Sequence, residues 1–322
     1  MRAVQVTRLD GPEALEYGEV PDPSAGPGQA LIEVHAAGVT FPDLLLTRGR
    51  YQIKPELPFV PGSEVAGVVR VAPEGSGLAV GDRVAAFPGF GGFAELVAVD
   101  PQAVFPLPDR VSYTAGAGLP MNCLTVHFAL VRRGRMTSGE TVLVHGAAGG
   151  VGTAAVQLAR ALGARVIAVV SAEAKRETAR EAGAHEVVLA EGFRDAVREL
   201  TGGRGVDLVV DPVGGDRFTD SLRSLAPEGR LLVIGFTAGD IPTVKVNRLL
   251  LNNIDVVGVG WGGFWLQRPG YLREQWDQLT PLLEKGDLDP LLAGARPLRD
   301  AAGALAELDE RRVAGKLVLD VR

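Results

Sequence analysis

Short runs of alternating or β-branched residues dominate roughly the first 120 positions of the chain, and glycine and proline clusters separate them. This pattern is typical of strands joined by tight turns. The expected strands cover residues 30–39, 64–72, 82–87 and 93–99. Two helices are expected in the same region, at 42–49 after Pro42 and at 112–120 after Ser112. The first part of the chain is therefore predicted to be β-rich.

From about residue 125 the pattern changes. Unbroken apolar runs recur at 141–146, 165–171, 185–190, 206–211, 230–236 and 254–261, with helical patterns between them. Such runs suit strands that are buried on both faces. After the first run, apolar residues follow a helical spacing along one face, at Val151, Ala155, Leu158, Ala159 and Leu162. Alternating strands and helices predict a doubly wound parallel sheet.

The last part of the chain returns to a mixed pattern, with helices expected at 271–286 and 300–312 and a strand at 315–321. We therefore divide the chain into a β-rich domain over 1–122, a parallel-sheet domain over 123–260, and a C-terminal segment over 261–322 that returns to the first domain.

Size and charge narrow the class of protein. A chain of 322 residues favours two domains, and a net charge of −6 argues against nucleic-acid binding. No stretch is apolar enough to span a membrane, and the first residues lack the apolar core of a signal peptide. The single cysteine, Cys123, cannot form an internal disulfide, which fits a reducing compartment such as the cytoplasm.

The stretch VLVHGAAGGVG, at 142–152, joins the first strand of the parallel sheet to a helix. Glycines here let the backbone approach a diphosphate, which the free N–H groups of the helix start would bind. The pattern is imperfect, because Ala147 occupies the first position of G-x-G-x-x-G. The alternative is a plain turn that binds nothing. The expected coenzyme contacts are Gly146, Ala147, Ala148, Gly149, Gly150, Val151 and Gly152.

The end of the second strand indicates which coenzyme would bind. An NAD site would have Asp or Glu there to contact the ribose hydroxyls. This chain has Ser171 instead, followed by Lys175 and Arg176. A hydroxyl with two cations suits the 2′-phosphate of NADPH, although Glu173 lies nearby. A solvated helix face is the alternative interpretation of the two cations.

Several motifs, in this order, resemble those of the medium-chain dehydrogenase/reductase superfamily: VGDRV, LTVHFAL, VLVHGAAGGVG, DPVGG, VIGF and a final GKLVL. The chain is most similar to its NADPH:quinone oxidoreductase (zeta-crystallin-like) branch. The resemblance covers essentially the whole chain. It implies a GroES-like catalytic domain split around a Rossmann domain, an active site in the cleft between them, and a homodimer.

The same resemblance permits a test for zinc. Zinc-dependent members carry ligands at the positions of Thr40 and Ser63, with a third near Met121. None of the three is a usual zinc ligand. The four histidines, His35, His127, His145 and His185, are far apart in the sequence. We therefore predict no metal, and a structural role for Glu64.

Without a metal, the expected chemistry is hydride transfer from a reduced nicotinamide to a conjugated acceptor such as a quinone. The resemblance places Thr125 near the nicotinamide. It places two loops against the coenzyme: Gly235, Phe236 and Thr237 in one, and Gly260 and Trp261 in the other. Asp211, which ends the fourth strand, is either a site residue or the cap of a turn.

The remaining candidate residues are those expected near the electron acceptor. Related quinone reductases usually have Asn at the position of Thr40, and we take Thr40, Tyr51 and Thr125 as candidate catalytic residues. Tyr51 either donates a hydrogen bond or simply packs. The aromatic group of Trp261, Phe264 and Trp265 is either an apolar wall for a planar acceptor or a domain-interface core.

Two other functions stay open. One is reduction of enoyl thioesters, because related enoyl reductases have a G-V-N-F-x-D segment where this chain has GVTFPD. The other is a non-catalytic, crystallin-like protein that binds NADPH without turnover. The resemblance names neither the electron acceptor nor the number of electrons transferred per step.

Overall fold

The structure is a computed structural model that describes residues 1–322. The chain forms two compact units, which are described separately. Unit 1 comprises Met1–Met121, Pro269–Glu284 and Leu292–Arg322, and unit 2 comprises Asn122–Arg268 and Lys285–Leu291. No helix combines the length and the apolar character that a membrane crossing requires.

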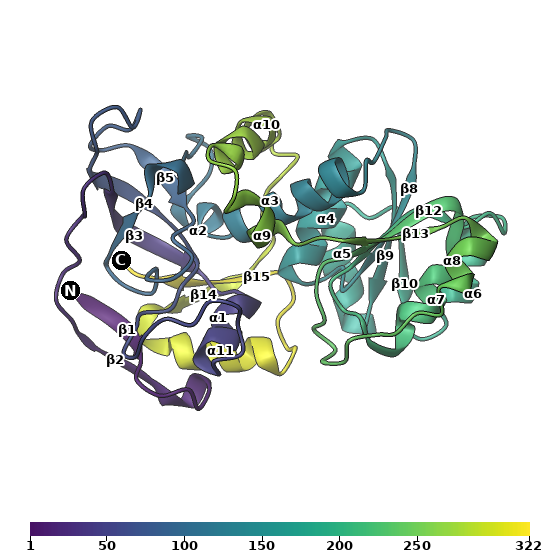
Figure 1. Cartoon of the computed structure of the whole chain (residues 1–322), viewed down its shortest axis with the longest axis horizontal. Coiled ribbons are helices and arrows are strands. Elements are labelled where there is room, and N and C mark those ends of the chain that lie inside the picture. Colours follow the sequence, from purple (N-terminus) through teal and green to yellow (C-terminus); the bar gives the residue numbers. More distant parts are fainter. The chain divides into compact units, whose positions relative to one another are not determined.

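Unit 1 is built around a seven-stranded, mostly antiparallel sheet (Figure 1). Its strands are β3 (Ala30–Gly38), β4 (Glu64–Val71), β5 (Arg83–Ala86), β6 (Leu96–Val99), β7 (Val104–Pro106), β14 (Leu292–Pro297) and β15 (Lys316–Asp320), and a separate pair is formed by β1 (Arg2–Val6) and β2 (Leu15–Glu19). Its helices are α1 (Phe41–Thr47), α2 (Tyr113–Gly116), α10 (Tyr271–Lys285) and α11 (Ala301–Asp309).

This sheet combines an early and a late segment of the chain. The C-terminal strand β15 pairs antiparallel with β3, with Val318 opposite Gly38. Strand β15 therefore belongs to the same sheet as β3, and the segments Pro269–Glu284 and Leu292–Arg322 lie in unit 1. One expected strand is shorter than predicted. Strand β6 begins only at Leu96, because Ala94 forms a bridge with Ala3 of β1.

Unit 2 contains a six-stranded sheet in which every pairing is parallel. The strand order is β10-β9-β8-β11-β12-β13. The strands are β8 (Thr141–His145), β9 (Arg165–Val170), β10 (Glu186–Leu189), β11 (Val206–Asp211), β12 (Leu225–Val233) and β13 (Asp255–Gly258). This order reverses direction at β8, as in a Rossmann fold, and the predicted doubly wound sheet is confirmed.

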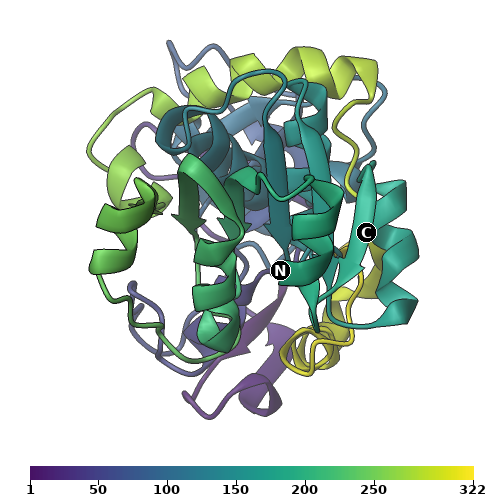
Figure 2. The same ribbon diagram turned by 90° about the vertical axis from the view of Figure 1, so that its right-hand side faces the viewer.

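Helices cover both faces of this sheet. α4 (Gly150–Ala161) and α5 (Arg176–Glu181) lie on one face, and α6 (Phe193–Leu200), α7 (Phe218–Arg223) and α8 (Asn247–Asn252) lie on the other (Figures 1 and 2). Unit 2 also holds most of α3 (Pro120–His127), a π-helix (Phe128–Arg133) and α9 (Trp261–Trp265). The core beneath α6 and α7 is apolar, with Leu143, Val209 and Leu231 fully buried.

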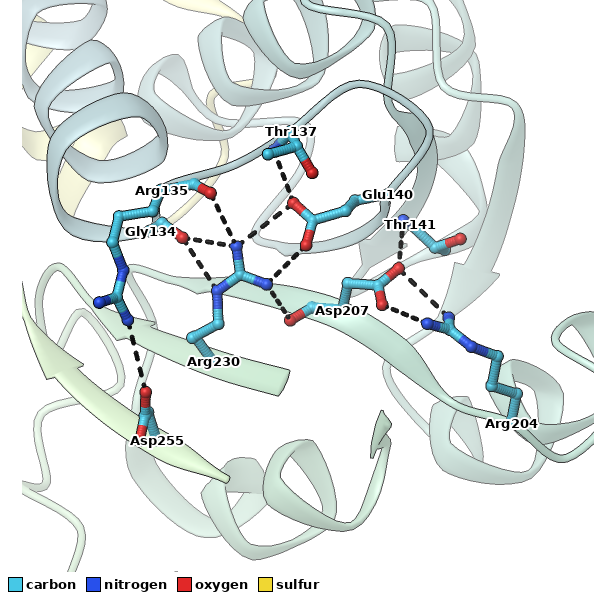
Figure 3. Close-up of polar contacts among 9 residues, drawn as sticks. All are labelled: Gly134, Arg135, Thr137, Glu140, Thr141, Arg204, Asp207, Arg230 and Asp255. Atoms are coloured by element: carbon cyan, nitrogen blue, oxygen red, sulfur yellow. Dashed lines mark hydrogen bonds and ion pairs between the residues drawn. The ribbon is translucent and has the colours of Figure 1, made fainter. Parts of the chain in front are cut away.

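A set of polar contacts among several residues lies at the amino-terminal edge of this sheet (Figure 3). The Arg230 guanidinium donates to the backbone oxygens of Gly134, Arg135 and Asp207, and forms an ion pair with Glu140, with 2.7 Å between Nη1 and Oε1. The bonds tie β12 to β11 and to the turn before β8. We call this set of contacts the Arg230 cluster.

Candidate functional site

The glycine turn lies at the carboxyl-terminal edge of the parallel sheet, between β8 and α4. Gly146 has a φ of 58°, in the left-handed region that favours glycine. Gly152 is needed for a different reason. A Cβ atom there would lie 2.1 Å from the backbone oxygen of Gly146, so no side chain fits. Gly152 therefore allows α4 to approach the end of β8 closely.

Gly149 has no such packing constraint. It is the N-cap of α4 in an extended conformation, and an added Cβ would meet only the Gly146 oxygen, at an ordinary 3.4 Å. Being glycine, it offers no capping side chain to the first amides of α4, those of Gly150, Val151 and Gly152. These N–H groups have no acceptor within the helix and carry the positive end of its dipole. The turn thus fits a diphosphate group.

The expected 2′-phosphate contacts follow β9. Ser171 is exposed, and Lys175 is partly buried in the turn before α5. Arg176 already has two partners. Its Nε lies 2.8 Å from a Glu173 carboxylate oxygen, and its Nη1 donates to the backbone oxygen of Val187. All three residues follow β9 closely in the chain, and the Arg176 guanidinium forms an ion pair with the exposed Glu173.

Asp211, at the end of β11, is a turn cap. One of its carboxylate oxygens accepts from the N–H groups of Val213 and Gly214, both at 2.9 Å. Burial raises the pKa of Asp211, and the two backbone hydrogen bonds oppose that effect. Of the two interpretations of this residue, the structure supports the turn cap.

The two predicted coenzyme loops also lie at the ends of parallel strands. Thr237 donates its N–H to the Pro212 oxygen at 3.2 Å, so the loop after β12, which includes Gly235 and Phe236, packs on the turn after β11. Gly260 is the N-cap of α9, and Trp261 is its first residue. Ligands of such folds bind at the carboxyl ends of the strands.

The aromatic group in α9 packs within unit 2. The Trp261 and Trp265 rings are 6.0 Å apart, and the Phe264 ring is 4.9 Å from that of Phe128. The guanidinium of Arg268 lies 3.8 Å from the Phe264 ring centre. Phe264 is therefore used in local packing. Thr125, the remaining predicted contact, lies in α3.

Unit 1 contains the second group of candidate residues, a buried set formed by Thr40, Asp43 and Ser63, which we call the hydroxyl cluster. The Thr40 hydroxyl donates to Asp43 Oδ2 at 2.6 Å and lies 2.9 Å from the Ser63 hydroxyl. Asp43 also accepts from the backbone N–H groups of Thr40 and Gly62. Thr40 and Asp43 form a capping box that begins α1.

Asp43 was not among the predicted site residues. Burial raises its pKa to about 6, against the lowering effect of the Thr40 hydrogen bonds. The Thr-x-x-Asp spacing at 40–43 is a sequence signal for the cap. No nearby sequence pattern indicates the third member, Ser63, because it lies 20 residues from Asp43 in the chain.

Two neighbours of this cluster have structural roles. Tyr51 packs on the apolar cluster of Val6, Leu46 and Phe59, and burial raises its pKa. Tyr51 was expected either to donate a hydrogen bond or to pack, and this contact supports the packing role.

Glu64 is fully buried and uses both carboxylate oxygens: one pairs with Lys316, and the other accepts the Met121 N–H at 2.7 Å. Glu64 therefore ties β4 to β15 and to the start of α3.

The residues at the ligand positions of zinc-dependent relatives do not fit zinc. Thr40 and Ser63 offer neutral hydroxyls that are hydrogen-bonded to each other and to Asp43. Zinc sites in proteins use Cys, His or carboxylate ligands. Nowhere in the chain do three His, Cys, Asp or Glu side chains gather in a way that would hold a metal ion.

Comparisons with known proteins agree with this architecture. Residues 26–109 match the alcohol dehydrogenase GroES-like domain, and residues 150–285 match the zinc-binding dehydrogenase family. Quinone oxidoreductase-like protein 2 of Rattus norvegicus is 37% identical, over 100% of this chain and 92% of its own. The chain belongs to the quinone oxidoreductase family of the medium-chain dehydrogenase/reductase superfamily.

Solved structures show the same fold. A probable oxidoreductase from Mycobacterium abscessus is 49% identical, with a TM-score of 0.92 and coverage of 100% of this chain and 99% of its own. The quinone oxidoreductase of Thermus thermophilus, solved alone and with NADPH, is 37% identical, with a TM-score of 0.85 and full coverage of both chains. The chain is thus an oxidoreductase with a GroES-like domain and a Rossmann-type sheet.

Proposed function

We propose that this protein catalyses NADPH-dependent, zinc-independent reduction of quinones or related α,β-unsaturated carbonyl compounds. The observation that carries the proposal is the glycine turn, in which Gly149 leaves the first amides of α4 uncovered. The Thermus thermophilus relative, solved with NADPH, supports the choice of coenzyme. We place the reaction in the cytoplasm.

Each group of residues has a distinct task in this proposal. The amides of Gly150, Val151 and Gly152 bind the diphosphate, and Ser171 with Lys175 binds the 2′-phosphate. The loops at 235–237 and 260–261 position the coenzyme. When bound, the reduced nicotinamide supplies a hydride. A conjugated acceptor suits transfer without a metal, because its π-system spreads the developing negative charge.

We also propose that the protein is a homodimer. The edge strand β13 has one pairing partner, and exposed apolar side chains precede it at Ile241, Val246, Leu250 and Leu251. An open edge strand can pair with its own copy about a two-fold axis, and exposed apolar groups mark interfaces. Light scattering should give twice the chain mass, and Leu250→Glu with Leu251→Glu should give monomers. A monomeric wild type would contradict this proposal.

The function is tested by following NADPH oxidation with a panel of quinones, alkenals and enoyl thioesters, with NADH as the second coenzyme. We expect turnover of quinones or alkenals with NADPH, insensitive to a chelator. Preference for enoyl thioesters would identify the alternative enzyme. NADPH binding, detected by its fluorescence, without turnover of any acceptor would identify a non-catalytic binder.

A further inference from the structure

A small cavity lined by arginines lies on the face of the unit 2 sheet that α6, α7 and α8 cover (Figure 1). It has a volume of about 230 Å³, and we call it the arginine pocket. Its lining residues are Arg194, Leu222, Arg223, Leu225, Arg248, Asn252 and Ile254. Leu225 begins β12 and Ile254 directly precedes β13, whereas the glycine turn follows the carboxyl end of β8. The pocket is therefore separate from the candidate coenzyme site.

The arginines of this pocket outnumber their carboxylate partners. One oxygen, Asp220 Oδ1, lies 3.1 Å from Nη1 of Arg223 and 3.8 Å from Nη1 of Arg194. The Arg248 guanidinium has no hydrogen bond or ion pair within the chain. Three arginines against one aspartate leave a net charge of +2, although the whole chain has a net charge of −6. The pocket thus differs from the Arg230 cluster, in which the guanidinium has a carboxylate of its own.

The number and geometry of the donors indicate a phosphate group as the ligand. A guanidinium offers several N–H donors in a planar fork, which matches the oxygens of a phosphate. A phosphate monoester carries a charge of about −1.5 to −2 at pH 7, close to the opposite of the charge of the pocket. Leu222 and Ile254 are only 4% and 5% exposed and give the pocket an apolar base. Less water near the ligand strengthens its attraction to the arginines.

We propose that the arginine pocket binds the phosphate group of a small anion, which is either free phosphate or a phosphate monoester. Arg194, Arg223 and Arg248 donate hydrogen bonds to its oxygens. Because these arginines come from α6, α7 and α8, the bound phosphate links the three helices. The site goes beyond the proposed function, since it involves neither the coenzyme nor the electron acceptor.

The helix that phosphate binding should affect most is α8. None of its six residues is buried, and only Leu249 packs against the core beneath α6 and α7. A helix with few buried apolar contacts opens readily, so its amide hydrogens exchange fast with solvent. Phosphate bound to Arg248 holds α8 to its two neighbours through Arg194 and Arg223. Binding should therefore slow hydrogen exchange in α8.

Calorimetric titration of the full chain with inorganic phosphate and with phenyl phosphate, at low ionic strength and neutral pH, tests the site. We expect saturable binding by the wild type. Arg248→Gln and Arg194→Gln should each weaken binding by about tenfold, because each removes charge-assisted hydrogen bonds. Asp220→Asn should strengthen binding severalfold, because it removes the carboxylate that competes for two of the arginines. Tighter binding of phenyl phosphate identifies a monoester as the ligand, and equal binding identifies free phosphate.

Two control variants separate this pocket from other cationic positions. Arg198→Gln removes the same charge from the same helix as Arg194→Gln, at a residue that does not line the pocket. Lys175→Gln removes a cation of the candidate coenzyme site. Both variants should retain the phosphate binding that Arg248→Gln loses. Loss of that binding in Lys175→Gln, together with normal binding in Arg248→Gln, would overturn the proposal.

Hydrogen exchange followed by mass spectrometry locates the bound phosphate. We expect phosphate to slow exchange at 247–252 in the wild type and to leave exchange there unchanged in Arg248→Gln. Slowing confined to 150–152, in the glycine turn, or no saturable phosphate binding by the wild type, would contradict the inference. Neither measurement requires NADPH or turnover, so a failure of the proposed function leaves this test unaffected.

Discussion

The two edges of the parallel sheet in unit 2 differ in their polar groups: one has paired charged side chains and the other has uncapped backbone amides. At the amino-terminal edge, the Arg230 guanidinium donates to three backbone oxygens and to the Glu140 carboxylate (Figure 3). At the carboxyl-terminal edge, the glycine turn has no charged side chain, and the first amides of α4 are left without a capping group.

The comparison shows that charge alone is a poor guide to function. The Arg230 cluster is rich in charged groups, but its guanidinium already has partners within unit 2 and gains little by binding a ligand. The glycine turn has only backbone dipoles, but they lack acceptors and face a position that an anion can occupy. We therefore expect substitutions in the Arg230 cluster to lower stability and to leave coenzyme binding unchanged. In the glycine turn, we expect one substitution to lower stability and a different one to lower coenzyme binding.

The largest expected effect is that of Gly152→Ala on folding. Its Cβ atom would lie 2.1 Å from the Gly146 oxygen, so the turn or α4 must move. We expect the free energy of unfolding to fall by about 4 kcal/mol, measured by urea denaturation. Gly303→Ala, in α11 with open space around it, is the matched control and should be neutral or slightly stabilising. Wild-type stability of Gly152→Ala would contradict the packing role.

The second largest expected effect is that of Arg230→Met on stability. It leaves Glu140 without its buried partner and three backbone oxygens without a donor, and should cost about 3 kcal/mol of stability. The folded fraction should bind NADPH as the wild type does. Arg223→Met, which removes an exposed ion pair with Asp220, should change stability by less than about 0.5 kcal/mol. A change in NADPH affinity in Arg230→Met would show that the two edges are coupled.

Gly149→Val should have the opposite effect, with stability retained and NADPH binding weakened. The added Cβ meets only an ordinary contact in the protein, so the thermal midpoint should hardly change. The side chain would occupy the space in front of the first amides of α4, and NADPH affinity should fall by about 100-fold, which corresponds to roughly 2.7 kcal/mol. Fluorescence titration with NADPH measures the effect. Normal binding by this variant would place the diphosphate elsewhere.

The smallest expected effect concerns the 2′-phosphate. Lys175→Ala should weaken NADPH binding by about tenfold and NADH binding much less, because only NADPH carries the extra phosphate. Glu173→Gln should shift the preference the other way, since it removes the negative charge beside Arg176. Equal effects of Lys175→Ala on both coenzymes would remove this residue from the phosphate site.

Much of unit 2 was predictable because its signals are local. Each buried parallel strand is a continuous apolar run, and the helix after β8 repeats apolar residues along one face. The glycines at 146, 149 and 152 were recognisable as a turn, although their separate roles required coordinates.

Local signals were weaker in unit 1. The helix expected at 112–120 is only the short α2, with the next helix beginning at Pro120. The strand expected at 93–99 loses its first residues to a bridge with Ala3. At 93–99 the pairing with Ala3 replaces the start of the expected strand, and a local pattern carries no information about such a contact.

The sequence by itself determined the parallel sheet and the glycine turn, since these depend on backbone propensity and on the spacing of apolar residues, and its ordered motifs resemble those of the family. Only the tertiary structure decided which polar groups are paired. Lys316 meets Glu64, Arg230 meets Glu140, and Ser63 joins Thr40 and Asp43. The physical reason is that a hydrogen bond or ion pair requires contact within a few ångströms, and chain folding brings these distant residues together.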